Sequence, residues 1–281
     1  MPELTLRTPA KINPVLDILA RRPDGFHELF MHMVPVSVFD ELEFTLASSS
    51  HLEVAGADFS GELQENLVFQ ALKAFEEASG RPQTWHVVLR KAIPSGAGLG
   101  GGSSDAAATL KALNQLNRSP LGLSELWQLA QKLGSDVPFF LDPRPCAVRG
   151  RGERVDPLEG YPEAELLLIT PPFAISTAQA YRGCLPKIQE PPPLPQSTAE
   201  LASILRNQFE ASLIPQFPEL ERLQKLLRGH GAIGASVSGS GSTVFGVFPD
   251  HQARDQAFAQ LQGLALGRMF CCRILLHPQE P

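Results

Sequence analysis

The glycine run between residues 94 and 104 constrains the fold of this chain of 281 residues more than any other segment. Five of its first nine residues are glycine. Residues 84–90 before it favour a β-strand, and residues 104–116 after it favour a helix. Glycine lets the backbone adopt positive φ and approach a ligand closely, and a helix N-terminus presents free N–H groups. The segment therefore predicts a strand–loop–helix unit that binds phosphate.

Other interpretations of this loop fit less well. A Walker A loop needs a lysine that reaches the terminal phosphates, and this loop contains none. The dinucleotide fingerprint G-x-G-x-x-G matches at Gly96, Gly98 and Gly101, but the acid near the expected spacing, Glu125, lies at the start of a predicted helix. A flexible turn rarely needs five glycines that lead directly into a helix.

The composition argues against several classes of protein. A net charge of −6 and a pI near 5.7 disfavour a general nucleic-acid binder, which needs a basic surface. Cys146, Cys184, Cys271 and Cys272 form no C-x-x-C pair, so neither a zinc site nor a disulfide framework follows. No apolar run approaches the ~20 residues that span a bilayer, and no signal peptide is evident. We expect a cytosolic protein whose partner is a small molecule, with no nucleic acid or membrane partner.

The order of the expected elements favours an α+β fold, because strands and helices mix without strict βαβ alternation. The expected helices and strands are listed here by residue number: strands at 3–8, 15–20, 41–46, 84–90, 166–170 and 269–276, a strand–glycine loop–strand unit at 232–248, and helices at 66–79, 104–116, 124–133, 198–208, 219–229 and 251–263. Four prolines between residues 191 and 195 indicate a stiff connector. The strand at 166–170 is expected to open a second lobe.

Three segments together resemble the motifs of the GHMP kinase superfamily. Residues 94–105 are similar to its second motif, residues 9–13 (P-A-K-I-N) to its N-terminal motif, and residues 234–242 to its C-terminal glycine-rich motif. They occur in the right order over about 230 residues. The resemblance implies a two-lobed GHMP-kinase fold, with an N-terminal ATP-binding lobe at residues 1–160 and a C-terminal α/β-sandwich lobe at residues 161–281.

Further segments resemble one branch of this superfamily, the kinases of 4-diphosphocytidyl-2-C-methyl-D-erythritol. They are residues 22–29 (R-P-D-G-F-H-E-L), 134–140 (G-S-D-V-P-F-F) and 175–181 (I-S-T-A-Q-A-Y). The implied reaction is ATP-dependent phosphorylation of the 2-hydroxyl of the methylerythritol unit, in the non-mevalonate route to isoprenoid precursors. Pro14 replaces a usual leucine, and Phe26 replaces a usual tyrosine, which keeps an aromatic face but removes a hydroxyl.

The resemblance also implies roles for side chains. Asp136 is the expected catalytic base, with a capping aspartate as the structural alternative. Lys11 is its expected partner, because an unpaired ammonium in a mostly apolar stretch would be costly to bury. Phe26 and Tyr181 would stack on the cytosine, and His27 would bond to its edge. The expected substrate-binding residues are Asn13, Phe26, His27, Asp136, Thr177 and Tyr181.

The glycine loop is expected to hold ATP, with Lys91 reaching the nucleotide from the strand before it. The expected ATP-binding residues are Lys91, Pro94, Ser95, Gly96, Ala97, Gly98, Leu99, Gly100, Gly101, Gly102, Ser103 and Ser104. A second glycine loop, residues 239–242, is expected to lie beside the first. Mg²⁺ is expected because it neutralises phosphate charge, although no carboxylate cluster identifies its ligands.

Three alternative functions stay open. The chain could be another GHMP kinase, of the homoserine or mevalonate type, but residues 24–27 (D-G-F-H) speak against this. It could be a non-catalytic nucleotide sensor with the same fold, but the presence of both Lys11 and Asp136 favours an enzyme. A decarboxylase of the same fold would act on a mevalonate-derived acid, so a panel of substrates would separate it.

Overall fold

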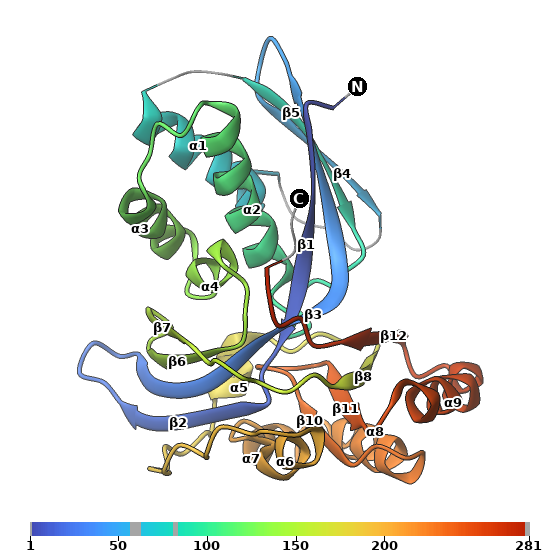
Figure 1. The fold of residues 1–281 in the computed structure, drawn as a ribbon. Coiled ribbons are helices and arrows are strands. Elements are labelled where there is room, and N and C mark those ends of the chain that lie inside the picture. The colour runs from blue at the N-terminus through green and yellow to red at the C-terminus, as the bar shows by residue number, and fades with distance from the viewer. Residues whose placement is uncertain (1, 57–62, 81–83, 279–281) are drawn as a thin grey trace.

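The computed structural model describes residues 2–56, 63–80 and 84–278 and contains two β-sheets with helices packed against them (Figure 1). Among these residues, the first sheet has eight strands: β1 (Leu4–Ile12), β2 (Val15–Arg21), β3 (His27–Leu46), β4 (His51–Gly56), β5 (Trp85–Lys91), β6 (Cys146–Gly150), β7 (Arg154–Pro157) and β9 (Arg206–Asn207). The second, antiparallel sheet has four: β10 (Gly234–Val237), β11 (Val244–Phe248), β8 (Glu165–Thr170) and β12 (Arg268–Arg273). The mixed α+β fold agrees with the sequence-based expectation.

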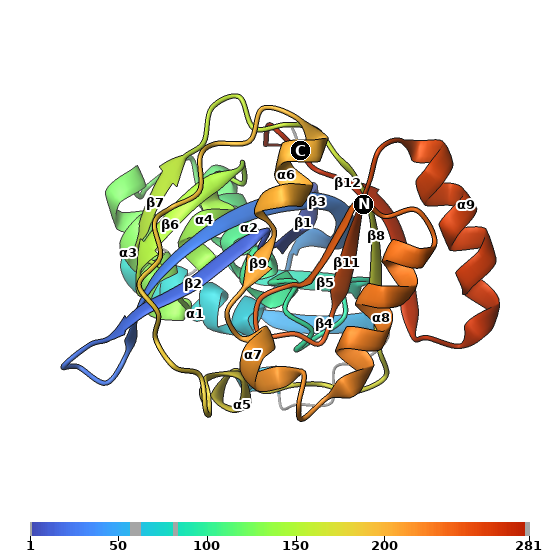
Figure 2. The same cartoon turned by 90° about the horizontal axis from the view of Figure 1, so that it is seen from below.

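The helices lie in two groups, one for each sheet (Figure 1). Those that cover one face of the first sheet, or pack on those that do, are α1 (Leu67–Ser79), α2 (Gly101–Leu116), α3 (Leu123–Leu133) and α4 (Val137–Leu141). The later helices are α5 (Thr177–Tyr181), α6 (Thr198–Ile204), α7 (Glu210–Leu213), α8 (Pro218–Gly229) and α9 (His251–Leu261). Figure 2 shows α8 and α9 beside the strands of the second sheet, which they contact.

Strand β3 is the central strand of the first sheet, because different strands pair with it along its 20 residues. Its second half pairs with β1 and β5, and its first half pairs with β2 and β6. The sequence predicts a strand only at 41–46, where buried and half-buried residues alternate. Residues 29–36 are buried on both faces, so they show no alternation that could indicate a strand.

Several predicted elements have different limits in the structure. Helix α2 begins at Gly101 and not at residue 104, so the glycine run itself forms its first turn. The helix expected at 198–208 ends at Ile204, and Arg206–Asn207 form β9, which pairs in parallel with β2. The short strands β4, β6 and β7 and the short helices α4 and α5 have no counterpart in the prediction, because each is too brief to show a period.

Segments of the second half of the chain join the two sheets. Strand β9 adds to the first sheet, and Ile274 bridges to Val36 in β3. The Arg206 guanidinium donates to Asp17 at 2.6 Å, and the Asp17 side chain is fully buried. The boundary predicted at residue 160 falls between β7 and β8, and it stays a prediction. Within the described ranges, no helix is long and apolar enough to cross a membrane.

Candidate active site

A cavity of about 920 Å³ lies between the two glycine loops and the turn that joins β2 to β3. The residues of the first loop that line it are Pro94, Ser95, Gly96, Ala97, Gly98, Gly100, Gly101, Gly102 and Ser103. Leu99 and Ser104 were also expected to bind ATP, but both side chains are buried away from the cavity. Leu99 packs in the core, and its carbonyl accepts the N–H of Lys11 at 2.9 Å. The buried Ser104 hydroxyl has no hydrogen-bond partner.

The second glycine loop lies directly against the first, as the sequence predicts. The Ser238 hydroxyl donates to the carbonyl of Gly98 at 2.9 Å, and the N–H of Thr243 donates to the carbonyl of Ala97 at 3.2 Å. Gly98 has φ +78°, and a Cβ there would lie 2.0 Å from the carbonyl oxygen of Ser238. Only glycine allows this approach, so the lining of the cavity at this point is backbone.

Lys91 does not line the cavity, which corrects the expectation that it reaches the nucleotide. Its ammonium is bound by Asp40 and, at 2.8 Å, by Asp105, and its side chain is 7% exposed. Burial by itself would lower the pKa of Lys91, but the two carboxylates outweigh it and raise that pKa. Thr8 donates to Asp105 at 2.7 Å, and Asp105 lies in the second turn of α2. Lys91 therefore supports the glycine loop from the core side.

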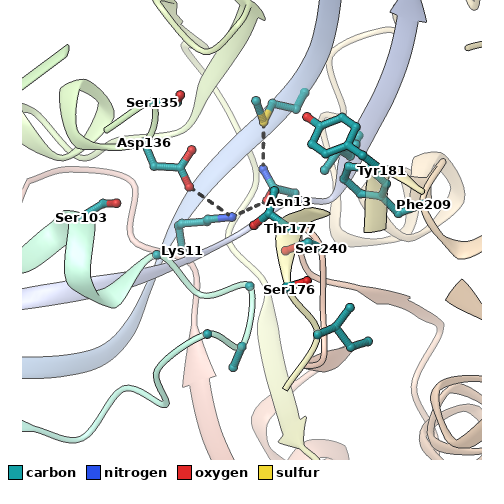
Figure 3. Close-up of a pocket in the computed structure, with 18 of the residues that line it drawn as sticks. Lys11, Asn13, Ser103, Ser135, Asp136, Ser176, Thr177, Tyr181, Phe209 and Ser240 are labelled. Atoms are coloured by element: carbon teal, nitrogen blue, oxygen red, sulfur yellow. Dashed lines mark hydrogen bonds and ion pairs between the residues drawn. The ribbon is translucent and has the colours of Figure 1, made fainter. Parts of the chain in front are cut away.

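Lys11, Asn13 and Asp136 meet in the cavity (Figure 3). The Lys11 ammonium lies 3.8 Å from the Asp136 carboxylate and donates to the Asn13 side chain at 2.6 Å. The predicted pairing of Lys11 with Asp136 is thus present. Burial lowers the pKa of Lys11, and the negative charge of Asp136 opposes this effect. Asn13 is fully buried and donates to the carbonyl of His32 at 3.1 Å, which fixes its orientation.

Asp136 stands immediately before α4 but does not cap it, since its side chain makes no hydrogen bond to the backbone of that helix. Lys11 is its ion-pair partner, and one third of the Asp136 side chain is exposed to the cavity and solvent. The structure therefore does not realise the capping alternative for Asp136, and its carboxylate can receive a proton from a bound molecule.

Aromatic residues form the other end of the cavity. The His27 and Tyr181 rings are stacked with centroids 4.6 Å apart, and Phe209 meets Tyr181 edge-on at 4.8 Å. Phe26 and Thr177 also line the cavity, and Phe26 is half exposed. Burial, followed by the charge of Arg21, lowers the pKa of His27, so at neutral pH its ring can both donate and accept. Figure 3 shows Tyr181 and Phe209 on the far side of Asn13 from Asp136.

Sequence reasoning missed some lining residues, among them Phe209, Arg151, Ser135 and Ser176. The Arg151 guanidinium lies 3.5 Å from the centre of the Phe26 ring. The segment R-G-R-G-E at residues 149–153 was a usable signal, because two glycines flank an arginine where no helix or strand is predicted. Phe209 carries no comparable signal, since its neighbours are ordinary residues of a connecting segment.

The site suits a nucleotide better than a tightly caged metal. A Cβ at Gly98 would collide with the carbonyl oxygen of Ser238, so at this point the lining consists of backbone groups, which suit phosphate. Across residues 2–56, 63–80 and 84–278, no group of three or more His, Cys, Asp or Glu side chains could hold a metal ion. A Mg²⁺ ion here would take most ligands from phosphates and water, as that ion commonly does.

Comparison with known proteins places the whole chain in one group. The family described as GHMP kinases N terminal domain matches residues 66–142, and GHMP kinases C terminal matches residues 187–264. Proteins named 4-diphosphocytidyl-2-C-methyl-D-erythritol kinase from Pelotomaculum thermopropionicum and Pelobacter propionicus are each 40% identical to it. These alignments cover 92% and 93% of this chain and 93% and 95% of the relatives.

Solved structures agree with the sequence comparison. A crystal structure of 4-(cytidine 5'-diphospho)-2C-methyl-D-erythritol kinase superimposes with a TM-score of 0.84 at 35% identity, covering 96% of this chain and 99% of that one. A homoserine kinase from Cytophaga hutchinsonii has a TM-score of 0.73 at 19% identity over 98% and 96% of the two chains, a likeness of fold alone. The chain therefore belongs to the GHMP kinases and, within them, to the family of 4-diphosphocytidyl-2-C-methyl-D-erythritol kinases.

Proposed function

We propose that this protein transfers the γ-phosphoryl group of ATP to the 2-hydroxyl of 4-diphosphocytidyl-2-C-methyl-D-erythritol, a step of the non-mevalonate route to isoprenoid precursors. The observation that carries the proposal is the Lys11–Asp136 pair, which lies where two glycine loops enclose one cavity. Relatives that bear this kinase name and are 40% identical over nearly the whole chain support the choice of acceptor.

The glycine loop binds the phosphates of ATP through its backbone. The loop runs directly into α2, so N–H groups of the first helical turn face the cavity and carry partial positive charge. Gly96, Gly98 and Gly100 all have positive φ, between 64° and 78°. Glycine adopts these conformations readily, and without a Cβ it lets phosphate oxygens approach the main chain.

Asp136 acts as the general base. It accepts the proton of the acceptor hydroxyl as that oxygen attacks the γ-phosphorus and the bond to the β-phosphate oxygen breaks. Lys11 stabilises the negative charge that develops nearby, and Asn13 holds the Lys11 ammonium in place. A Mg²⁺ ion would be held mainly by phosphate oxygens and water, because the described residues offer no carboxylate cluster, and it would neutralise phosphate charge.

The aromatic end of the cavity binds the cytidine. Phe26, His27 and Tyr181 line one region, and stacking on such rings stabilises a pyrimidine base. The neutral His27 ring suits a cytosine edge, because that edge presents both acceptors and a donor. Thr177, at the start of α5, lies beside Tyr181 in the same wall and completes the acceptor site.

The direct test is ADP release from ATP and Mg²⁺ with four acceptors: 4-diphosphocytidyl-2-C-methyl-D-erythritol, mevalonate, homoserine and galactose. We expect turnover with the first acceptor and none with the others. Turnover with mevalonate or homoserine would keep the fold and overturn the acceptor. Nucleotide binding without turnover of any acceptor would favour the sensor hypothesis, and release of CO₂ from a mevalonate-derived acid would favour the decarboxylase.

A further inference from the structure

Arg151 is a cation of the cavity wall for which the proposed reaction so far has no use. It lies in the turn between β6 and β7, on the wall that also contains Phe26. Among the described residues that line the cavity there is one lysine, Lys11, and one arginine, Arg151. Lys11 is already bound to Asp136 and Asn13, whereas Arg151 has only a long ion pair, 4.0 Å, with Asp24, which does not line the cavity.

The backbone around Arg151 is held firmly in place. Its own N–H donates to the Glu153 carboxylate at 2.5 Å, which closes the turn. Gly152 has φ +117°, and a Cβ there would lie 3.1 Å from the carbonyl oxygen of Ser135, the residue before Asp136. This close packing fixes the turn beside the catalytic carboxylate. The Arg151 side chain therefore starts from a defined position at the acceptor end of the cavity.

The Arg151 guanidinium has N–H donors that are available to a ligand. Its flat face lies over the Phe26 ring, 3.5 Å from the centroid, and such stacking leaves the in-plane N–H groups free to bind. Its ion-pair partner, Asp24, is 4.0 Å away, beyond hydrogen-bond distance. Asp24 is also engaged elsewhere, since it accepts the Phe26 N–H at 3.1 Å and pairs with Arg22. A planar fork with free donors suits bidentate binding of phosphate.

We propose that Arg151 binds the diphosphate of the cytidine-linked acceptor and thereby makes the enzyme specific for a nucleoside diphosphate over an uncharged or singly charged alcohol. The inference rests on the proposed function, because it places the cytosine at the Phe26 end. The contacts of Arg151 are with Phe26 and Asp24, and the next residue, Gly152, packs against Ser135, all on the acceptor side. Phe26 has two faces, and Arg151 covers one, so the same residue can order the base and the arginine together.

The test compares CDP with cytidine by calorimetry, with a saturating non-hydrolysable ATP analogue present so that the glycine loop is occupied. For R151M we expect affinity for CDP to fall about tenfold, in the range of charge-assisted hydrogen bonds, and affinity for cytidine to change less than twofold. R151K keeps the positive charge but loses the planar set of N–H donors, so its CDP affinity should lie between those of the wild type and R151M. The control is R154M, an exposed arginine of β7 outside the cavity, which should leave both affinities unchanged.

Each other outcome overturns the inference in a distinct way. Equal weakening of CDP and cytidine would mean that Arg151 acts through the Phe26 stack. An unchanged CDP affinity with a raised KM for ATP would assign Arg151 to the donor. Unchanged affinities in R151M would remove the residue from recognition. These measurements follow CDP binding, so they test the inference even if the wild-type protein fails to turn over the acceptor. Such a failure would overturn the proposed function separately.

Discussion

Adding one methyl group at Gly98 should separate the two glycine loops. In Gly98→Ala the new Cβ would lie 2.0 Å from the carbonyl oxygen of Ser238, where ordinary contact begins near 3.4 Å. The Cβ position is fixed by the backbone of residue 98, and the atom that it meets is a backbone oxygen. No side-chain rotation can therefore relieve the clash. One loop must move, and the hydrogen bonds that Ser238 and Thr243 donate to the first loop must lengthen or break.

The cost follows from these contacts. An alanine at φ +78° loses about 1 kcal/mol relative to glycine, and each hydrogen bond contributes about 1 kcal/mol. Gly98→Ala should therefore lower the free energy of unfolding by about 3 kcal/mol. Gly96→Ala is the matched control, because φ is +64° there but the new Cβ would meet only Ala174, at 4.0 Å. That variant should lose only about 1 kcal/mol, from the backbone conformation alone.

Urea unfolding of the wild type and both variants measures the difference, and calorimetry with ATP shows its effect on binding. We expect Gly98→Ala to lose about 2 kcal/mol more stability than Gly96→Ala and to bind ATP more weakly. A Gly98→Ala protein that fails to fold while Gly96→Ala folds is the extreme of the same result. Equal unfolding free energies for the two variants would refute the claim that the loops depend on backbone contact at Gly98.

Three further predictions concern charged and titratable groups. Asp136→Asn should keep the Kd for ATP but lower kcat by roughly 10²–10⁴-fold, as loss of a general base does, and single-turnover kinetics would detect near-normal chemistry if the role is wrong. Lys91→Met should lower the free energy of unfolding by about 3–5 kcal/mol, because Asp40 and Asp105 would stay buried without their cation, and a loss no larger than that of an exposed lysine such as Lys225→Met would contradict this. Burial, followed by the charges of Arg206 and Arg149, lowers the pKa of His32 to about 4 from 6.5, so the unfolded chain takes up the proton first as the pH falls. The contribution of His32 to the free energy of unfolding should be complete above pH 6.5 and decline by about 3 kcal/mol toward pH 4. When urea unfolding is measured at a series of pH values, His32→Gln should lack this decline.

The sequence predicts those parts of the site that depend on local chemistry. A lysine in an apolar stretch requires a partner, and Asp136 is that partner in the structure. A glycine run between a strand and a helix predicts a phosphate-binding backbone, and residues 94–98 and 100–103 do line the cavity. The same local logic predicts the helix at 66–79. In the structure α1 begins after Asn66, which accepts the Val68 N–H at 2.9 Å, and it ends at Gly80 with φ 59°.

The remainder depends on contacts between distant segments. Lys91 looks like a nucleotide ligand in sequence, but its partners lie 14 and 51 residues away, and a one-dimensional pattern cannot pair them. Burial on both faces hides the first half of β3 for a related reason, since it removes the alternation that marks a strand. Arg151 belongs to a turn whose position is set by contact with Ser135, so its place in the cavity wall appears only in three dimensions.

The two halves of the cavity differ in what lines them, and under the proposed function this difference bears on how specificity can change. The donor end is lined by backbone of the glycine loop, so a substitution there acts mainly by adding a Cβ, as at Gly98. The proposed acceptor end is lined by the side chains of Phe26, His27, Arg151 and Tyr181. Side chains there can be exchanged without moving the main chain. We therefore expect ATP use to be nearly fixed by the fold, whereas the choice of acceptor follows from a few exchangeable residues, of which Phe26 and Arg151 form one stacked unit.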